Sequence, residues 1–244
     1  MRRQDTNTPI DIFGATVRGP AHIADAVPNQ DAWGRGRAGN AHIVVVSDGM
    51  GSRPHARDGA RAACSAVIDA VRHWRRHPDA SVDILFGLIQ LFWRARVAPK
   101  CAADCACTCL FAVVEPDGSG LAAQLGDGLV VVQGDEGTST LVARCDDRFA
   151  NETNALGVTS RISAWTKLQL EKGARSVVLC TDGVADDLVL DRLGTFVEWL
   201  IDDVRPSGPA KRRHILKRAF REWPTPNHLD DKTIAVLHVS EVRR

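Results

Sequence analysis

The sequence lacks a charge excess of either sign. Its 244 residues hold 31 Lys and Arg against 30 Asp and Glu, a formal net charge of +1. The charges are spread along the chain, so the sequence shows no basic stripe of the kind that binds nucleic acid. It also lacks any apolar run close to the length of a membrane span. We therefore expect neither a nucleic acid nor a membrane as partner.

A signal-peptide core is absent from the first residues, MRRQDTNTPIDIFG. We therefore expect a cytoplasmic protein whose cysteines stay reduced. No internal repeat or low-complexity segment divides the chain, and the linker-like stretch 205–213 is too short to separate domains. The sequence thus predicts a single domain over residues 1–244, long enough to bury a good core.

The seven cysteines do not have the spacing of a zinc site. Four of them, Cys101, Cys105, Cys107 and Cys109, lie within nine residues. Zinc knuckles favour C-x2-C pairs, whereas the last three cysteines alternate as residues of a strand do. We interpret Cys105, Cys107 and Cys109 as small buried side chains on one face of a strand that continues into LFAVV.

Apolar residues recur at helical spacing in some regions and form strand-like runs in others. Steps of three and four residues predict four helices, at 60–74, 82–93, 193–200 and 215–223. Apolar runs predict strands at about 42–47, 108–115, 121–125, 128–133, 165–170, 176–181 and 233–239. Short turns such as EPDGSG join the strands after the first two helices, and short turns favour antiparallel pairing. We therefore expect an α+β fold in which helix pairs pack on antiparallel sheets.

Acidic residues stand where these strands end. Asp48, Asp127 and Asp182 each follow an apolar strand and precede Gly, and Asp230 and Asp231 stand directly before the last strand. A single Asp-Gly pair is a common turn, and acidic residues also begin helices. Several at strand ends instead indicate carboxylates that converge on one edge, where a bound cation relieves their repulsion. Oxygen ligands favour Mg²⁺ or Mn²⁺ over Zn²⁺.

The order of the segments resembles the metal-dependent Ser/Thr protein phosphatases of the PP2C (PPM) type, in their compact bacterial form. Six pieces match in chain order: PNQDAW, VVVSDGMGS, ACTCLFAVV, AAQLGDGLVVV, VVLCTDGVADDL and DDKTIAVLHV. They span a core of about 14–239. The resemblance implies an α-β-β-α sandwich, in which two antiparallel sheets are flanked by helix pairs and a cleft at one end holds metal ions.

The resemblance also assigns metal ligands. The implied set is Asp31, Asp48, Gly49, Asp127, Asp182, Asp186, Asp230 and Asp231. In this assignment Asp48 bridges two ions and the Gly49 carbonyl completes the second, while Asp182 binds the first. Asp230 is a ligand as well, and Asp48, Asp182 and Asp230 are the implied catalytic residues.

The remaining acidic residues match less central positions of the family. Asp231 falls where the family has Asn, and Asp31 matches the acidic residue of the first motif. Asp127 and Asp186, with Asp182, fall where some members bind a third ion.

Three positions depart from the family pattern. Gln30 stands where animal members carry Glu. Met50 replaces a His that is thought to protonate the leaving group in eukaryotic members, although bacterial members commonly read Asp-Gly-Met-Gly. The phosphate-binding Arg has no clear match, and Arg18 and His22 are the two candidates.

The implied activity is hydrolysis of phosphoserine and phosphothreonine in proteins by a water that bridges two metal ions, Mn²⁺ or Mg²⁺. No protein nucleophile is needed, so we interpret Cys180 as an inert thiol at a strand end. The expected partners are a phosphorylated protein and a cognate Ser/Thr kinase. The kinase is expected because RFANETNALG and GPAHIADAVPNQDAW resemble a bacterial subgroup often linked to one.

Two other functions stay open on the sequence. A catalytically weak regulator that binds a phosphoprotein or partner would keep the same fold. Gln30 and Met50 leave room for it, whereas the intact Asp48, Asp182 and Asp230 argue for catalysis. A nuclease could use a similar acidic cluster, but the balanced charge and the lack of a basic, aromatic-lined face weigh against it.

Overall fold

The computed structural model describes residues 10–135, 137–142, 154–223 and 229–240. Most of the RFANETNALG segment, residues 148–153, lies outside these ranges. Within the described ranges, none of the helices combines the length and the hydropathy that crossing a lipid bilayer requires.

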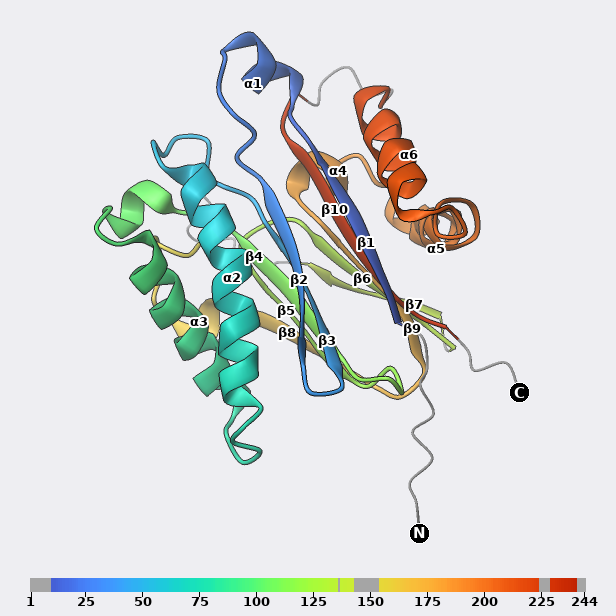
Figure 1. The fold of residues 1–244 in the computed structure, drawn as a ribbon, viewed down its shortest axis with the longest axis horizontal. Coiled ribbons are helices and arrows are strands. Elements are labelled where there is room, and N and C mark those ends of the chain that lie inside the picture. Colours follow the sequence, from blue (N-terminus) through green and yellow to red (C-terminus); the bar gives the residue numbers. More distant parts are fainter. Residues whose placement is uncertain (1–9, 136, 143–153, 224–228, 241–244) are drawn as a thin grey trace.

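Two five-stranded antiparallel sheets pack face to face (Figure 1). One sheet has the order β1 (Ile10–Val17), β10 (Lys232–Val239), β9 (Ala174–Cys180), β6 (Leu129–Gly134) and β7 (Gly137–Val142). The other has the order β2 (Ala32–Ala38), β3 (Ala41–Ser47), β4 (Cys109–Val114), β5 (Gly120–Leu125) and β8 (Thr166–Leu170). We refer to them as the β10 sheet and the β3 sheet.

Helix pairs cover the outer faces of both sheets. The pair on the β3 sheet is α2 (Ala56–Trp74) and α3 (Val82–Val97). The β10 sheet carries α5 (Leu193–Glu198), which continues into a π-helical segment (Trp199–Val204), and α6 (Pro209–Arg221). Two short helices, α1 (Pro20–Ala24) and α4 (Asp182–Ala185), lie at one end of the sandwich (Figure 1). The predicted α+β sandwich is confirmed.

The layered arrangement explains the continuous apolar runs in the strands. In β3, Ile43 and Val45 pack against α2 and α3, whereas Val44 and Val46 pack into the space between the two sheets. A central strand of this sandwich is therefore buried on both faces, and its sequence shows no polar alternation. All seven predicted strands are present, including β8, an edge strand in which exposed residues alternate with more buried ones.

The cysteine prediction is correct in burial and wrong in local structure. Cys105, Cys107 and Cys109 are all buried in the core beneath α2 and α3. However, Cys105 ends a 3₁₀ turn (Ala102–Cys105), and Cys107 makes two isolated bridges, one to Gly49 and one to Leu156. Only Cys109 belongs to the strand. A Cβ on Gly59 would lie 1.7 Å from the Cys105 carbonyl oxygen, so α2 packs directly on this turn.

Candidate metal centre

The acidic residues meet in a cleft at the end of the sandwich. Asp48 follows β3, Asp127 lies in the turn between β5 and β6, and Asp182 begins α4 directly after β9. Together with Asp230, just before β10, they line a cleft of about 230 Å³. Three antiparallel strands of two different sheets therefore end at one place, as the sequence pattern predicts.

Asp48, Asp127 and Asp182 form one close group. Each offers one carboxylate oxygen, and these oxygens all lie within 4.8 Å of one another, as do the ligand atoms of a second group, His22, Asp230 and Asp231. That spacing brings three negative charges close together. The other residues that line the cleft are Asp230, His22 and uncharged residues. Such an arrangement suits a divalent cation with oxygen ligands.

The backbone around Asp48 is held by Thr108, a residue to which no sequence pattern points. Asp48 N–H donates to Thr108 Oγ1 at 2.9 Å, and Thr108 N–H donates to the Asp48 carbonyl oxygen at 2.8 Å. Ser47 Oγ donates to the Thr108 carbonyl oxygen at 2.6 Å. These bonds fix the direction in which the Asp48 side chain leaves β3.

The glycines that follow the aspartates serve different purposes. Gly128, after Asp127, has φ +102°, a conformation that other residues rarely adopt. Gly49 and Gly183 are not among the positive-φ glycines, but a side chain would collide there. A Cβ on Gly49 would lie 2.6 Å from the Ala56 carbonyl carbon, and a Cβ on Gly183 would lie 2.0 Å from the Asp231 carbonyl oxygen.

The crowding of carboxylates changes their protonation. Burial, followed by the charges of Asp31, Asp182 and Asp230, raises the pKa of Asp48 well above its ordinary value. Burial, followed by the charges of Asp127 and Asp230, raises the pKa of Asp182 to about 6. Without a cation these groups therefore compete for protons near neutral pH.

Asp31 lies behind this cleft. It is buried, and Thr181 Oγ1 donates to its Oδ2 at 2.9 Å. Burial is the largest cause that raises the pKa of Asp31 to about 7. Its Oδ1 is also enclosed but accepts no amide or hydroxyl hydrogen from the described residues. A cation would supply a partner for this oxygen, so the donor set fits a metal ion of the Mg²⁺ or Mn²⁺ type.

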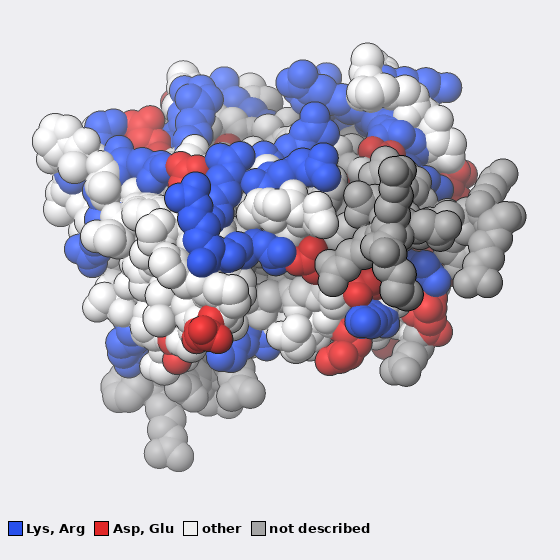
Figure 2. All heavy atoms as spheres, turned by 60° about the horizontal axis from the view of Figure 1, so that its bottom comes forward, with Lys and Arg blue, Asp and Glu red and all other residues white. Residues whose placement is uncertain are grey.

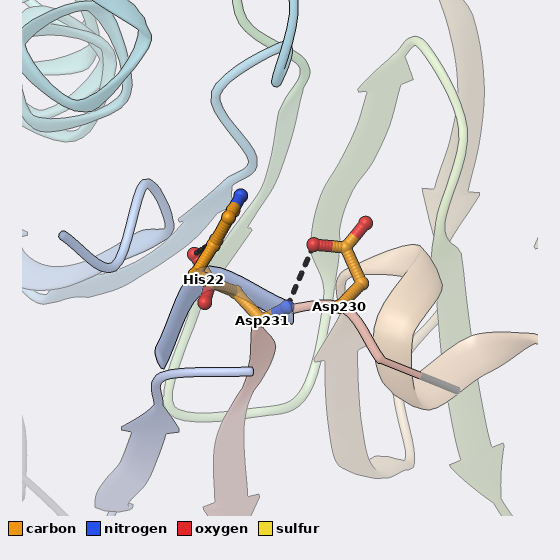
Figure 3. Close-up of side chains that lie close together, drawn as sticks. All are labelled: His22, Asp230 and Asp231. Carbon is orange, nitrogen blue, oxygen red and sulfur yellow. Dashed lines mark hydrogen bonds and ion pairs between the residues drawn. The ribbon is translucent and has the colours of Figure 1, made fainter. Parts of the chain in front are cut away.

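Asp231 is oriented differently from Asp230 (Figure 3). Its carboxylate is buried and accepts the N–H of Gly19 at 2.7 Å and the N–H of Gln30 at 2.6 Å. It also lies 2.9 Å from Nδ1 of His22. Asp230, by contrast, is exposed to the cleft, and its Oδ1 accepts the Asp231 N–H at 2.7 Å. Asp231 thus links the segment from Gly19 to Gln30, which contains α1, to the start of β10.

The other candidates lie at and around the rim. Asp186 is exposed at the end of α4 and adds to the negative charge that acts on Asp182. Gln30 and Met50 both line the cleft. His22 lines it too, whereas Arg18 turns its guanidinium to the His22 carbonyl oxygen.

Comparison with known proteins places the chain in a family. The family model "Protein phosphatase 2C" matches residues 18–221. Serine/threonine-protein phosphatase 3 of Escherichia coli (strain K12) is 27% identical over 186 residues, which cover 71% of this chain and 72% of that protein.

Solved structures of low sequence identity share the fold. Serine/threonine phosphatase Stp1 from Staphylococcus aureus has a TM-score of 0.65 at 15% identity, with 99% of each chain covered. A C. elegans sex-determining protein also has a TM-score of 0.65, at 16% identity; 95% of this chain is covered, but this chain spans only 65% of that longer one. Since the family model matches most of the sequence, the chain belongs to the protein phosphatase 2C family of metal-dependent protein phosphatases.

Proposed function

We propose that the protein hydrolyses phosphoserine and phosphothreonine esters in phosphorylated proteins. The observation that carries the proposal is the group formed by Asp48, Asp127 and Asp182, whose oxygens lie within 4.8 Å of one another. The named activities of the E. coli relative and of Stp1 support the choice of serine and threonine. The whole of residues 1–244 acts as one phosphatase domain in this proposal.

The cofactor in this proposal is Mn²⁺ or Mg²⁺, with two ions in the cleft. Asp48, Asp182, Asp230 and the Gly49 carbonyl would hold them, with Asp31 behind Asp48. Asp127 and Asp186, with Asp182, would hold a third ion. When bound, such ions lower the pKa of water and stabilise charge on the phosphoryl group.

Asp231 acts as a positioning residue rather than as a direct ligand. Its two oxygens are occupied by the N–H groups of Gly19 and Gln30, and it lies beside His22. It therefore holds α1 and the loop before Asp31 against β10. This role explains why a buried carboxylate can stand at a position where the family pattern has Asn.

His22, rather than Arg18, contacts the substrate phosphate in this proposal. His22 is held by Asp231 at the wall of the cleft, in the segment that precedes Asp31. The Arg18 guanidinium instead donates to the His22 carbonyl oxygen, so Arg18 supports the main chain of α1. Met50 offers no proton to a leaving group, so the leaving oxygen takes its proton from solvent.

The partner and the compartment are further parts of the proposal. A cognate Ser/Thr kinase is the proposed partner, and the cytoplasm is the proposed compartment. Six cysteines of the described residues are free, namely Cys64, Cys101, Cys105, Cys107, Cys109 and Cys180. Free thiols of this kind persist in a reducing compartment.

The test is phosphate release from a phosphothreonine peptide with Mn²⁺, with Mg²⁺ and with chelator. Asp182→Asn keeps the shape and an acceptor for the Gly183 N–H but removes a ligand charge, so we expect at least a hundredfold lower turnover. Asp79→Asn, at an exposed turn, is the matched control. No turnover by a folded wild-type protein that still binds Mn²⁺ would show a regulator that binds phosphoproteins, and would contradict the proposal.

A further inference from the structure

Basic side chains gather on the folded surface although the net charge is only +1. Figure 2 shows Lys and Arg side chains predominating across the upper half of one face. In the sequence, α6 alone carries six Lys and Arg in 13 residues and no Asp or Glu. They are Lys211, Arg212, Arg213, Lys217, Arg218 and Arg221. Such a helix produces a strong local positive potential.

Two of these six residues have acidic partners. Arg212 Nη1 lies 2.7 Å from a carboxylate oxygen of Asp11, and Arg218 Nε lies 3.0 Å from Glu222. The others form no ion pair with any described residue. Three of the unpaired residues are spaced by four, so they share one line along the helix. We call Arg213, Lys217 and Arg221 the α6 basic row.

The basic row is unfavourable for the helix itself. Like charges at i and i+4 repel, and Lys211 and Arg212 in the first turn add positive charge that opposes the helix dipole, whereas Arg221 in the last turn is favourable to it. The pKa of Lys217 is lowered, first by burial and then by the charges of Arg213 and Arg221. Elsewhere, Arg75, Arg96, Lys100 and Arg175 each have a carboxylate nearby. A place where the residues depart from local preferences for charge pairing often marks a functional surface.

The apolar side chains of α6 are packed in the core and are not free to enter a membrane. Leu216 and Phe220 are buried against the β10 sheet, and Trp223 packs on Phe220 with 5.5 Å between ring centroids. A helix that binds lipid needs a free apolar face to insert. Phe220 of α6 is also buried, so it is not available to stack on the bases of a single-stranded nucleic acid. An acidic polypeptide matches the positive charge of the row and needs neither a free apolar face nor an aromatic side chain.

The helix leads to the cleft. In Figure 1 its C-terminal end points to the end of the sandwich that carries α1 and the start of β10. The chain passes from Arg221 to Asp230 within nine residues. α6 therefore runs toward the end of the sandwich where Asp230 lies, so a polypeptide bound along this helix can extend to the cleft.

We propose that the α6 basic row docks an acidic segment of the phosphoprotein substrate. The proposal rests on the proposed phosphatase function and adds a substrate class to it: phosphoproteins with several Asp or Glu residues to one side of the phosphorylated residue. Docking lowers KM and leaves kcat almost unchanged, because the row lies outside the cleft.

The test compares two phosphothreonine peptides that share a core and differ in a tail of four Glu or four Gln. We expect kcat/KM to be about fivefold higher for the Glu tail, since exposed ion pairs are individually weak. Arg213→Gln/Lys217→Gln/Arg221→Gln should abolish the difference, and 0.5 M NaCl should reduce it. Arg57→Gln/Arg61→Gln/Arg76→Gln, at exposed residues 57, 61 and 76, removes the same charge and should keep it.

A second readout does not depend on catalysis. The fluorescence anisotropy of a labelled, unphosphorylated Glu-tail peptide should show binding to wild-type protein and about fivefold weaker binding to the α6 variant. Turnover of p-nitrophenyl phosphate should be equal in both proteins, which shows that the variant is folded. If no peptide is hydrolysed but anisotropy shows α6-dependent binding, the phosphatase proposal fails and the docking surface stands.

Three results would overturn the docking surface. Equal kcat/KM for the two tails in wild-type protein is the first. Equal losses in the α6 and the control variants would show a general charge effect. The third is α6-dependent binding of phosphatidylglycerol vesicles or of poly(U) without any preference for the Glu tail.

Discussion

The carbonyl oxygen of Asp231 lies only 2.0 Å from the position that a Cβ on Gly183 would take. Gly183 follows Asp182 and Asp231 follows Asp230, so this approach brings two cleft residues together. Thr233 N–H and Thr181 Oγ1 are joined beside it at 3.0 Å. The start of α4 and the start of β10 are therefore set against each other by backbone contact.

We expect Gly183→Ala to separate these two segments. The added methyl group should lower the free energy of unfolding by about 1–3 kcal/mol and weaken Mn²⁺ binding at least tenfold. Urea denaturation and calorimetric titration with Mn²⁺ measure the two effects. Gly87→Ala is the matched control, because nothing lies within 4 Å of a Cβ on this helical glycine. It should raise stability by about 0.5–1 kcal/mol. Unchanged Mn²⁺ affinity in Gly183→Ala would contradict the prediction.

Asp231→Asn should be destabilising although Asn is the family residue. Asn has one acceptor oxygen, so its amide group would face the N–H of Gly19 or of Gln30, donor against donor. We expect a loss of about 1–3 kcal/mol in the free energy of unfolding, as for a buried donor left without a partner. Equal stability of Asp231→Asn and wild type in urea would show that these two N–H groups find other acceptors.

A double-mutant cycle of His22→Gln and Asp231→Asn tests the contact between His22 and Asp231. The two residues lie 2.9 Å apart, so their effects on stability should not add. For activity, His22→Gln should raise KM for a phosphopeptide more than it lowers kcat, whereas Arg18→Gln should change stability alone. A raised KM in Arg18→Gln with unchanged stability would reverse the two assignments.

The metal-free protein should lose stability as the pH rises. The pKa of Asp31 in the folded state is about 7, above the ordinary value of 3.8, so the folded protein binds this proton more tightly than the unfolded chain. The stabilisation is complete below pH 3.8 and is lost as the pH rises through about 7. Asp182, with a pKa of about 6, acts in the same direction.

Thermal melts with chelator between pH 5 and pH 8 measure this effect. The fall in Tm should be smaller in Asp31→Asn, which carries no titrating group there, and should largely disappear with saturating Mn²⁺. An equally steep fall in Asp31→Asn would assign it to other groups.

Cys180 should be dispensable for catalysis. It is fully buried at the end of β9, and burial raises the pKa of its thiol far above the ordinary value. A thiol in that state is a poor nucleophile. Cys180→Ala should therefore keep kcat within about twofold and lower stability by about 1 kcal/mol through the small cavity. Loss of turnover in a folded Cys180→Ala protein would point to a covalent mechanism.

The sequence predicts the central strands better than the edges. β3, β9 and β10 are buried on both faces, so their apolar runs are visible. Of the four edge strands, β8 was predicted at 165–170, whereas β1, β2 and β7 were not predicted. In β2, a Cβ on Gly36 would lie 2.7 Å from Cγ2 of Ile68 in α2. The close packing of α2 on β2 therefore requires glycine at this position. No local pattern contains that information.

The same division holds for the candidate site. The strand–Asp–Gly pattern points to Asp48, Asp127 and Asp182, because each signal lies within a few residues. The contacts of Asp231 with Gly19, Gln30 and His22 join opposite ends of the sequence. The support from Thr108 likewise depends on the pairing of β3 with β4. Contacts of this kind become visible only in the fold.

Because β1 pairs with β10, the protein can become active only late in its synthesis. Asp31 leaves the ribosome early, but the loop that holds it is tied to Asp231, and β1 has β10 as its neighbour in the sheet. A nascent chain that ends before residue 231 therefore lacks both the neighbour of β1 and the last acidic residues of the cleft. Long-range pairing of this kind is slow and comes late in folding. The ribosome-bound protein should thus have no phosphatase activity until β10 has emerged.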